Sequence, residues 1–354
     1  MTLHTTASPP PARIAWIDAA KGACIFMVIL WHVATGAFNE AIYNDLPLDV
    51  YWTGLLTLFQ PLRMPLFFVI SGFLAHSAIT RRPWGQSLTS RILMLGWLYI
   101  LWASILLIYR TWLVGAFAPE QLEIAITGPI DYLAHLLLAD NTIWYLYALV
   151  IYFTLCKALK AQPVVLLGGL FLLYLGADRL TDITNFSKLI GYGFFYAAGC
   201  FGKPWIERFY ADVNVKRLLG TLIVLPIVML TGRQFDLFYH PVTQFLMSCL
   251  MVSVSIDMLS LLLKRWSLGW FQALGKQTLP VYVLHMLLIY PMALAFSTLA
   301  VDTQQGTLLF ASLPLLLGFA VLGLSLGIYH VLNRGPMKAL FDLPKLSMQR
   351  SVQE

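Results

Sequence analysis

Residues 14–38 read IAWIDAAKGACIFMVILWHVATGAF, a nearly unbroken apolar run that contains three ionisable side chains, Asp18, Lys21 and His32. A helix needs about 20 predominantly apolar residues to cross a bilayer, and this run is long enough. The rest of the chain has the same character, because 59% of its 354 residues are hydrophobic and only 11% are charged. A soluble domain has about 25% charged residues. The composition therefore excludes soluble, disordered, collagen-like and secreted disulfide-rich proteins, and it predicts a multi-pass membrane protein.

Ten apolar stretches predict an all-α polytopic membrane protein with about ten transmembrane helices. The mixed residues 118–141, which include Glu120 and Glu123, predict a loop with an interfacial helix. Residues 1–354 are expected to form a single membrane domain, with a helical core at about 13–335 and short tails at 1–12 and 336–354. The ten stretches are 14–38, 52–79, 92–109, 142–159, 163–176, 189–205, 218–231, 241–263, 278–299 and 307–332.

Basic residues decide the orientation of these spans, because loops rich in Lys and Arg stay in the cytoplasm. With the N-terminus inside, most of the 23 basic residues fall on the cytoplasmic side, and both termini are predicted to be cytoplasmic. Acidic residues such as Glu40, Asp45 and Asp49 then lie outside. The net charge of +6 therefore reflects orientation in the membrane and not a nucleic-acid surface. The basic residues assigned to the cytoplasm are Arg13, Lys21, Arg81, Arg82, Arg91, Lys157, Lys160, Lys203, Arg208, Lys216, Arg217, Lys264, Arg265, Lys276, Arg334, Lys338, Lys345 and Arg350.

The first stretch is not expected to be a cleavable signal peptide, because it is too long and carries charges in its first turns. The cysteines have neither zinc-site spacing nor an extracellular position for disulfides. We interpret them as packing residues, and we expect no metal site. The four are Cys24, Cys156, Cys200 and Cys249.

Ionisable groups inside a bilayer are costly and are candidates for function. Asp18 and Lys21 are three residues apart, on one face of a helix, and they are either an interfacial ion pair or a polar entrance for a charged donor. His32 follows Lys21 by eleven residues, which is close to three whole turns and about 16 Å along the axis. The three residues therefore form a polar track, and imidazole is the side chain best suited to proton transfer near neutral pH.

Arg63 is predicted to lie near the middle of the membrane, between Pro61 and Pro65. A guanidinium keeps its proton, so Arg63 is either a structural residue paired with Asp18 or another group, or a support for a phosphate or an oxyanion. The small residues Ser71 and Gly72 that follow predict close helix packing.

Three further intramembrane residues have structural as well as functional interpretations. His285 is expected to make a hydrogen bond between helices or to take part in the site. His76 is expected to be interfacial, and Asp257 is expected to pair with Lys264 or Arg265.

Trp144 and Tyr145 open the fourth stretch on the outer side, as members of an aromatic belt or as a platform for a sugar. The chain has no Walker loop, no metal-spaced histidine cluster and no Gly-x-Ser-x-Gly elbow, which excludes an ATPase and leaves a metal-dependent or serine hydrolase without support.

Four motifs together resemble the membrane acyltransferase-3 family. The first is Lys21, ten residues and then His32, preceded by RIAWIDAA at 13–20; the second is RMPLFFVISGF at 63–73. The third is IWYL at 143–146, and the fourth is GKQTLPVYVLH at 275–285. They extend from the first to the ninth stretch, and the opening DAAKG at 18–22 is most similar to the sugar O-acetyltransferase branch, which includes fucose O-acetylases.

The resemblance implies an enzyme of the bacterial cytoplasmic membrane that moves an acetyl group from cytoplasmic acetyl-CoA to a hydroxyl of a cell-surface or lipid-linked carbohydrate. His32 is then the essential base or acyl carrier, with Arg63 and Asp18 as the other catalytic candidates. The donor is expected to bind Lys21, Arg81, Arg82 and His285, with Arg91, Lys203, Lys264 and Arg265 as further phosphate-binding candidates. The acceptor is expected to bind Trp144, Tyr145 and Asn141.

Two other classes remain open. Ten spans with buried charges also suit a polysaccharide exporter or flippase, although we find no inverted repeat. A membrane scaffold without catalytic activity is the remaining alternative.

Overall fold

The computed structural model describes residues 15–43, 46–119, 128–301 and 307–344. These residues are helical apart from loops and one short parallel pairing of β1 (Ile42–Tyr43) with β2 (Ala300–Val301). Eight helices are long and apolar enough to cross a membrane, and a shorter apolar helix, α7 (Trp144–Ala158), accompanies them. The protein is therefore an all-α polytopic membrane protein, as predicted. The long helices are α1 (Ala15–Gly36), α3 (Gln60–Thr80), α5 (Met94–Phe117), α8 (Pro163–Leu180), α12 (Val215–Gln234), α13 (Pro241–Arg265), α15 (Thr278–Phe296) and α16 (Thr307–Leu332).

Short helical segments connect the long helices. They are η1 (Phe38–Glu40), α2 (Leu48–Thr57), α4 (Trp84–Ser87), the π-helical segment η2 (Leu88–Leu93), α6 (Pro129–Leu137), α9 (Thr184–Gly191), α10 (Gly193–Phe201), α11 (Lys203–Ala211), α14 (Gly269–Gly275) and η4 (Gly335–Leu340). α6 is the short helix expected within 118–141. Arg13, Asp45, Glu120, Glu123, Lys345 and Arg350 lie outside the described residues.

The second stretch, 52–79, is not one continuous helix, and that prediction is wrong. α2 ends at Thr57 and α3 begins at Gln60, with non-helical backbone at Phe59. Pro61 explains where α3 begins, because proline fits the first turn of a helix but lacks the N–H that an interior position needs. The break places Arg63 in the first turns of α3.

The sixth stretch, 189–205, is also divided, into α9, α10 and α11. Single turn residues, Tyr192 and Gly202, separate these three helices. A Cβ at Gly193 would lie 3.0 Å from the side chain of Leu170 and 3.2 Å from that of Tyr152, so this part of the chain is packed tightly against α8 and α7. Non-helical backbone at membrane depth is tolerated where protein buries it.

Glycines bring the core helices into close contact. A Cβ at Gly72 of α3 would lie 1.9 Å from the carbonyl oxygen of Tyr196 in α10, and one at Gly199 would lie 2.0 Å from the α3 backbone. Small residues allow two helix backbones to approach in this way, which confirms the packing prediction for Gly72. Between α14 and α1, a Cβ at Gly275 would lie 1.8 Å from the carbonyl oxygen of Asp18.

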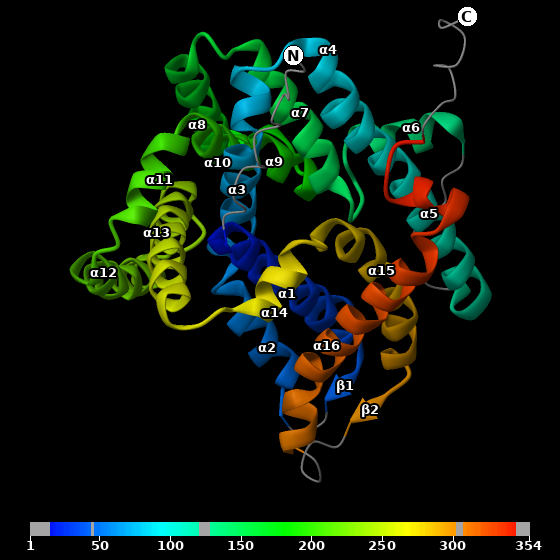
Figure 1. Ribbon diagram of the computed structural model, residues 1–354. Coiled ribbons are helices and arrows are strands. Elements are labelled where there is room, and N and C mark those ends of the chain that lie inside the picture. Colours follow the sequence, from blue (N-terminus) through cyan, green and yellow to red (C-terminus); the bar gives the residue numbers. More distant parts are fainter. Residues whose placement is uncertain (1–14, 44–45, 120–127, 302–306, 345–354) are drawn as a thin grey trace, which may run out of the picture.

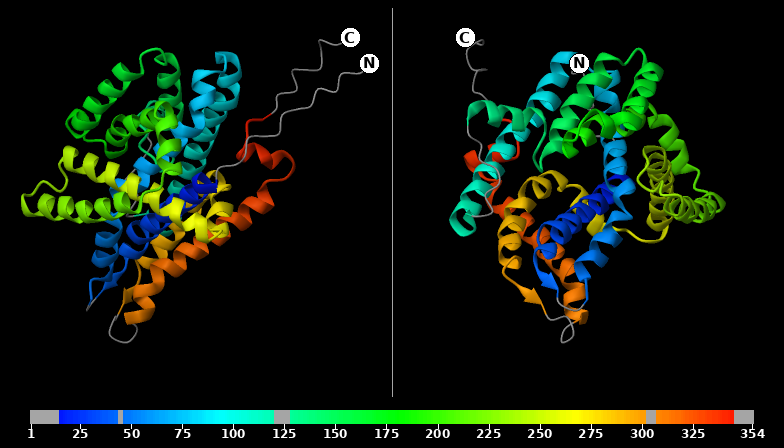
Figure 2. Two further views of the ribbon diagram at one scale, coloured as in Figure 1. Left: turned by 60° about the vertical axis from the view of Figure 1, so that its left-hand side comes forward. Right: turned by 180° about the vertical axis from the view of Figure 1, so that it is seen from behind.

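α1 runs through the middle of the molecule and packs against α3, α13, α14, α15 and α16 (Figure 1). α12 lies at one edge against α13 (Figure 2), and its Leu219, Ile223 and Leu230 are exposed. Apolar side chains on the outside of a membrane protein face lipid. Three cysteines, Cys24, Cys156 and Cys200, are buried, whereas Cys249 is exposed.

Candidate active site

A cavity of about 340 Å³ lies beside the second half of α1, within the range of about 300–1,000 Å³ that small-ligand sites occupy. Four of the predicted site residues line it, namely His32 from α1, Arg63 from α3, and Trp144 and Tyr145 from α7. We call this the histidine cavity. Its other lining residues are Ile25, Val28, Trp31, Gln60, Met64, Phe67, Thr142, Asn185, Lys188, Tyr192 and Tyr282.

His285 lies behind His32, and the centroids of the two imidazole rings are 5.3 Å apart. His285 is fully buried, and its Nδ1 lies 2.7 Å from the carbonyl oxygen of Tyr282. A carbonyl oxygen only accepts hydrogen bonds, so Nδ1 carries the proton and Nε2 of the neutral ring is an acceptor. Within the described residues Nε2 has no hydrogen-bond partner. His285 therefore presents a buried, unused acceptor in direct contact with the His32 region.

Arg63 is buried, with 7% of its surface exposed. Its guanidinium carbon lies 4.5 Å from the centroid of the Trp31 ring, which is a cation–π contact. Nη1 is buried and has no hydrogen-bond partner among the residues that the structure describes. Of the described residues that line the histidine cavity, none is an aspartate or a glutamate. The charge of Arg63 therefore faces a cavity without a carboxylate in its lining.

Trp144 and Tyr145 begin α7, but both are buried, with 8% and 5% of their surfaces exposed. The Tyr145 hydroxyl and Ser71 Oγ are hydrogen-bonded at 2.6 Å, and the Tyr145 ring lies 4.9 Å from that of Phe68. The residue before this pair, Ile143, is fully buried, so α7 begins inside the protein. The two aromatic residues are not part of an exposed belt, and that interpretation is wrong.

A second cavity, of about 220 Å³, lies on the other side of three residues, Phe67, Tyr145 and Tyr282, which line both cavities. Lys21 and Arg91 also line it, and we call it the lysine cavity. The Tyr282 hydroxyl donates to the carbonyl oxygen of residue 142 at 2.8 Å and accepts from the backbone N–H of Tyr145 at 3.3 Å. The three shared residues therefore form a partition in which Tyr145 and Tyr282 are hydrogen-bonded. The partition divides the predicted polar track, because Lys21 and His32 line different cavities.

A third cavity, of about 450 Å³, adjoins the histidine cavity at Gln60, Lys188 and Tyr192. Its lining includes Asp178 in the last turn of α8 and Asp182 in the loop after it, and we call it the aspartate cavity. The predicted orientation places these aspartates on the outer side and Lys21 on the cytoplasmic side. The three cavities then follow one another from the cytoplasmic side to the outer side.

The remaining predicted residues lie elsewhere. Arg81 and Arg82 are exposed at the end of α3 and line none of the three cavities. Asp18 is buried at the start of α1. Asn141 donates to the Tyr99 hydroxyl at 2.9 Å, and its carbonyl oxygen accepts from Asn185 at 3.2 Å. It therefore lies one residue outside the histidine cavity, which Thr142 and Asn185 line. Of the further phosphate-binding candidates Arg91, Lys203, Lys264 and Arg265, Arg91 lines the lysine cavity.

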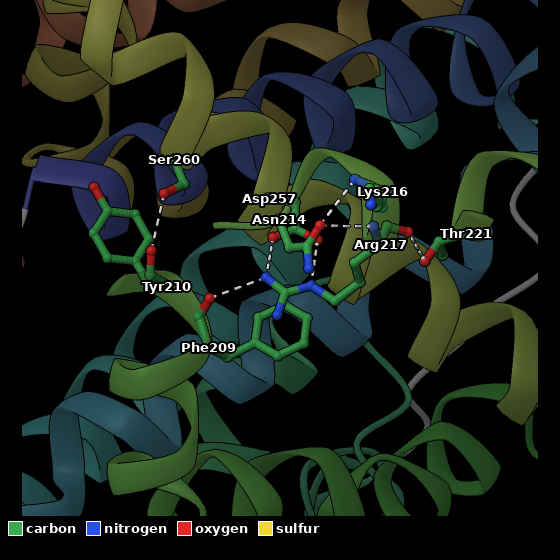
Figure 3. Close-up of polar contacts among 8 residues, drawn as sticks. All are labelled: Phe209, Tyr210, Asn214, Lys216, Arg217, Thr221, Asp257 and Ser260. Carbon is green, nitrogen blue, oxygen red and sulfur yellow. Dashed lines mark hydrogen bonds and ion pairs between the residues drawn. The ribbon is translucent and has the colours of Figure 1, made fainter. Parts of the chain in front are cut away.

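The predicted partner of one buried polar residue, Asp257, needs correction. Asp257 is fully buried and pairs with Arg217 of α12, not with Lys264 or Arg265: Arg217 Nε donates to Oδ2 at 2.8 Å and Nη2 bonds Oδ1 (Figure 3). His76 joins two helices, because its Nδ1 lies 2.8 Å from the Cys200 carbonyl oxygen in α10.

Sequence reasoning missed Lys157 and Lys188. Lys157 is 2% exposed, and its ammonium group donates to the carbonyl oxygens of residues 78 and 82 at 2.7 and 2.8 Å. These hydrogen bonds satisfy carbonyl groups that have no helical partner at the end of α3. Lys188 directly precedes the sixth predicted stretch, 189–205. A basic residue one position before a predicted span was the signal that would have drawn attention to it.

Fold and site together define a polytopic membrane protein with a histidine and an arginine in an intramembrane cavity. Residues 14–330 match the family described as an acyltransferase domain, and the chain belongs to this acyltransferase-3 family. Over 288 residues it is 25% identical to "Inner membrane protein YcfT" of Escherichia coli (strain K12), covering 77% of this chain and 79% of that protein. No solved structure gives a significant match. The family resemblance of the four motifs is thus confirmed, and the protein is a membrane acyltransferase.

Proposed function

We propose that the protein is an O-acetyltransferase of the cytoplasmic membrane, with acetyl-CoA as donor and a hydroxyl of a cell-surface or lipid-linked carbohydrate as acceptor. The observation that carries this proposal is the contact of two cavities at one partition. The lysine cavity offers Lys21 and Arg91 to an anionic donor on the side predicted to be cytoplasmic. The histidine cavity offers His32, Arg63 and aromatic rings to the acceptor. The similarity to an inner membrane protein supports the location.

In this proposal His32 is the general base. It removes the proton of the acceptor hydroxyl while the hydroxyl oxygen attacks the thioester carbonyl carbon. The C–O bond forms, and the carbonyl electrons move onto oxygen, where the positive charge of Arg63 in the same cavity stabilises the negative charge. When the intermediate collapses, the C–S bond breaks and the CoA thiolate takes the proton that His32 accepted. An acyl-His32 intermediate is the alternative route through the same cavity.

His285 supports His32 in this scheme. Its Nδ1–H is committed to the Tyr282 carbonyl oxygen, and its Nε2 has no partner among the described residues. A hydrogen bond from His32 to this acceptor, formed when the rings come closer than their present 5.3 Å between centroids, would favour one tautomer and one orientation of the catalytic imidazole, as the aspartate does in the histidine-containing triads of hydrolases. We therefore assign His285 as a positioning residue instead of a donor-binding residue.

The partition favours transfer over export. An exporter must offer a polymer a continuous route, whereas Phe67, Tyr145 and Tyr282 stand between the lysine and histidine cavities. A group-transfer enzyme needs only that the thioester reach this partition from one side and the hydroxyl from the other.

The test is a purified-protein assay with radiolabelled acetyl-CoA and lipid-linked glycans in liposomes, paired with glycan analysis of cells that lack the protein. The proposal predicts labelled glycan in the assay and loss of acetyl groups from exported glycans in the cells. Normal acetylation together with polymer retained inside the cells would contradict it and favour the exporter.

A further inference from the structure

We propose that the acceptor carries an anionic group, a carboxylate or a phosphate, which binds between Arg63 and Lys188 in the histidine cavity. This inference rests on the proposed function, because it describes the acceptor of that reaction. Its basis is the distribution of charge in the cavity lining, where two basic side chains, Arg63 and Lys188, face a space that no carboxylate of the described residues lines.

Arg63 supplies the first part of the site. With 7% of its surface exposed, it is more than nine-tenths buried, and its Nη1 has no hydrogen-bond partner among the described residues. A buried charge without a counterion is strongly unfavourable, and the cation–π contact with Trp31 offsets only part of that cost. An anionic ligand would complete the coordination of the guanidinium, which binds carboxylates and phosphates through two parallel hydrogen bonds.

Lys188 supplies the second part and points to the source of the anion. It lines both the histidine cavity and the aspartate cavity, so it stands at the passage between them. Its ammonium group makes no hydrogen bond or ion pair with another described residue. The neighbouring carboxylate of Asp178 accepts from Ser187 Oγ at 2.5 Å. Lys188 therefore lies where the two cavities adjoin, and it can hold an anionic group on the Arg63 side, away from the carboxylates of Asp178 and Asp182.

The donor has its own cationic site. Lys21 and Arg91 line the lysine cavity, on the other side of the partition from Arg63 and Lys188. The phosphates of acetyl-CoA would bind Lys21 and Arg91. An anion bound by Arg63 and Lys188 would then belong to the acceptor. Trp144 and Tyr192, stacked at 6.2 Å and 25°, lie next to this second pair and provide an aromatic face for a sugar ring.

Glucose derivatives with and without an anionic group at C6 test the inference on the full-length protein in detergent. The probes are methyl glucoside, methyl glucuronide and glucose 6-phosphate, and the first readout is the melting temperature without acetyl-CoA. We expect a charged sugar to bind at least about tenfold more tightly than the neutral one, since a hydrogen bond to a charged group contributes about 1.5–3 kcal/mol. Whether the carboxylate or the phosphate binds better identifies the anionic group. Equal binding of all three sugars, or no binding, would overturn the inference.

Variants test whether Lys188 causes the preference for a charged sugar. Lys188→Met should lower the affinity for the charged sugar about tenfold and leave that for the neutral sugar unchanged, and Lys188→Arg should restore it. Lys216→Met, at an exposed position, is the matched control and should have no effect. A charge preference that persists in Lys188→Met, or a Lys188-dependent shift produced only by adenosine 3′,5′-bisphosphate as a donor fragment, would overturn the inference.

Acetyl transfer to the same sugars, measured by mass spectrometry, separates this inference from the proposed function. Selective binding of a charged sugar without transfer to any glycan would contradict the proposed function and leave the anion site standing. Transfer to neutral and charged acceptors at equal rates would support the function and overturn the anion site.

Discussion

The imidazole rings of His32 and His285 lie 5.3 Å apart between their centroids and are tilted by 45°, although 253 positions of sequence separate them and they belong to α1 and α15. His285 holds its Nδ1 proton on the Tyr282 carbonyl oxygen and keeps Nε2 unpaired among the described residues. This arrangement gives His32 a neighbour that can accept a proton or orient the ring. It is the basis of the first prediction.

Replacing His285 by Ala should lower the rate of acetyl transfer about 10- to 100-fold, as part of the 10²- to 10⁴-fold that a general base contributes. Because His285 acts through His32, the pH profile of kcat should also shift. The control is His76→Ala, which removes a hydrogen bond between α3 and α10 and should lower the melting temperature without moving the pH profile. Unchanged pH profiles in both variants would show that His285 has only a structural role.

Donor binding should depend on Lys21 and not on the exposed arginines. Lys21 lines the lysine cavity, so Lys21→Ala should raise KM for acetyl-CoA about tenfold with little change in kcat. The double variant Arg81→Ala/Arg82→Ala should keep its KM within about twofold, because exposed charges contribute about 0–1 kcal/mol. A larger effect of the arginine pair than of Lys21 would place the donor outside the lysine cavity.

Helix packing at Gly72 should tolerate no side chain. Gly72→Ala places a Cβ 1.9 Å from a backbone oxygen of α10, so α3 and α10 must separate, and we expect a loss of at least about 1–3 kcal/mol, the usual cost of overpacking. The matched control is Gly168→Ala in α8, where nothing lies within 4 Å of the new Cβ. The free energy of unfolding of this control should rise by about 0.5–1 kcal/mol, because alanine has a higher helix propensity than glycine. Thermal unfolding in detergent measures both, and equal melting temperatures would contradict the close contact.

The Arg217–Asp257 pair should matter more for stability than an exposed ion pair. Arg217→Met leaves the fully buried Asp257 without its counterion, and breaking a buried pair costs about 3–5 kcal/mol. The double variant Arg217→Met/Asp257→Leu should recover much of this loss. Lys203→Met removes the partly exposed pair with Glu207 and should cost about 0–1 kcal/mol. If the single and double variants unfold at the same temperature, the pair is not coupled as described.

The long helices could be predicted from sequence because each is a run of apolar residues long enough to cross a bilayer. The break at Tyr192 could not, since it depends on the packing of one helix against others, as at Gly193. For the break at Phe59, Pro61 was a local signal that the prediction of one continuous stretch did not use. His32 and Arg63 were found as polar residues in apolar stretches, a local signal. The fold brings His285, Tyr145 and Lys188 close to these two residues. No periodic pattern in the sequence predicts that proximity. The aromatic-belt interpretation of Trp144 and Tyr145 failed for the same reason, because a position at the start of a helix does not reveal that the helix begins inside the protein.

The central claim, that His32 carries out the transfer, is tested most directly by His32→Ala in liposomes. Acetyl transfer from labelled acetyl-CoA to a lipid-linked glycan acceptor is measured beside the unaltered protein, with the melting temperature as a check on folding. The proposed function predicts no detectable transfer by a variant that melts within a few degrees of the unaltered protein. Full transfer by a folded His32→Ala protein would contradict it.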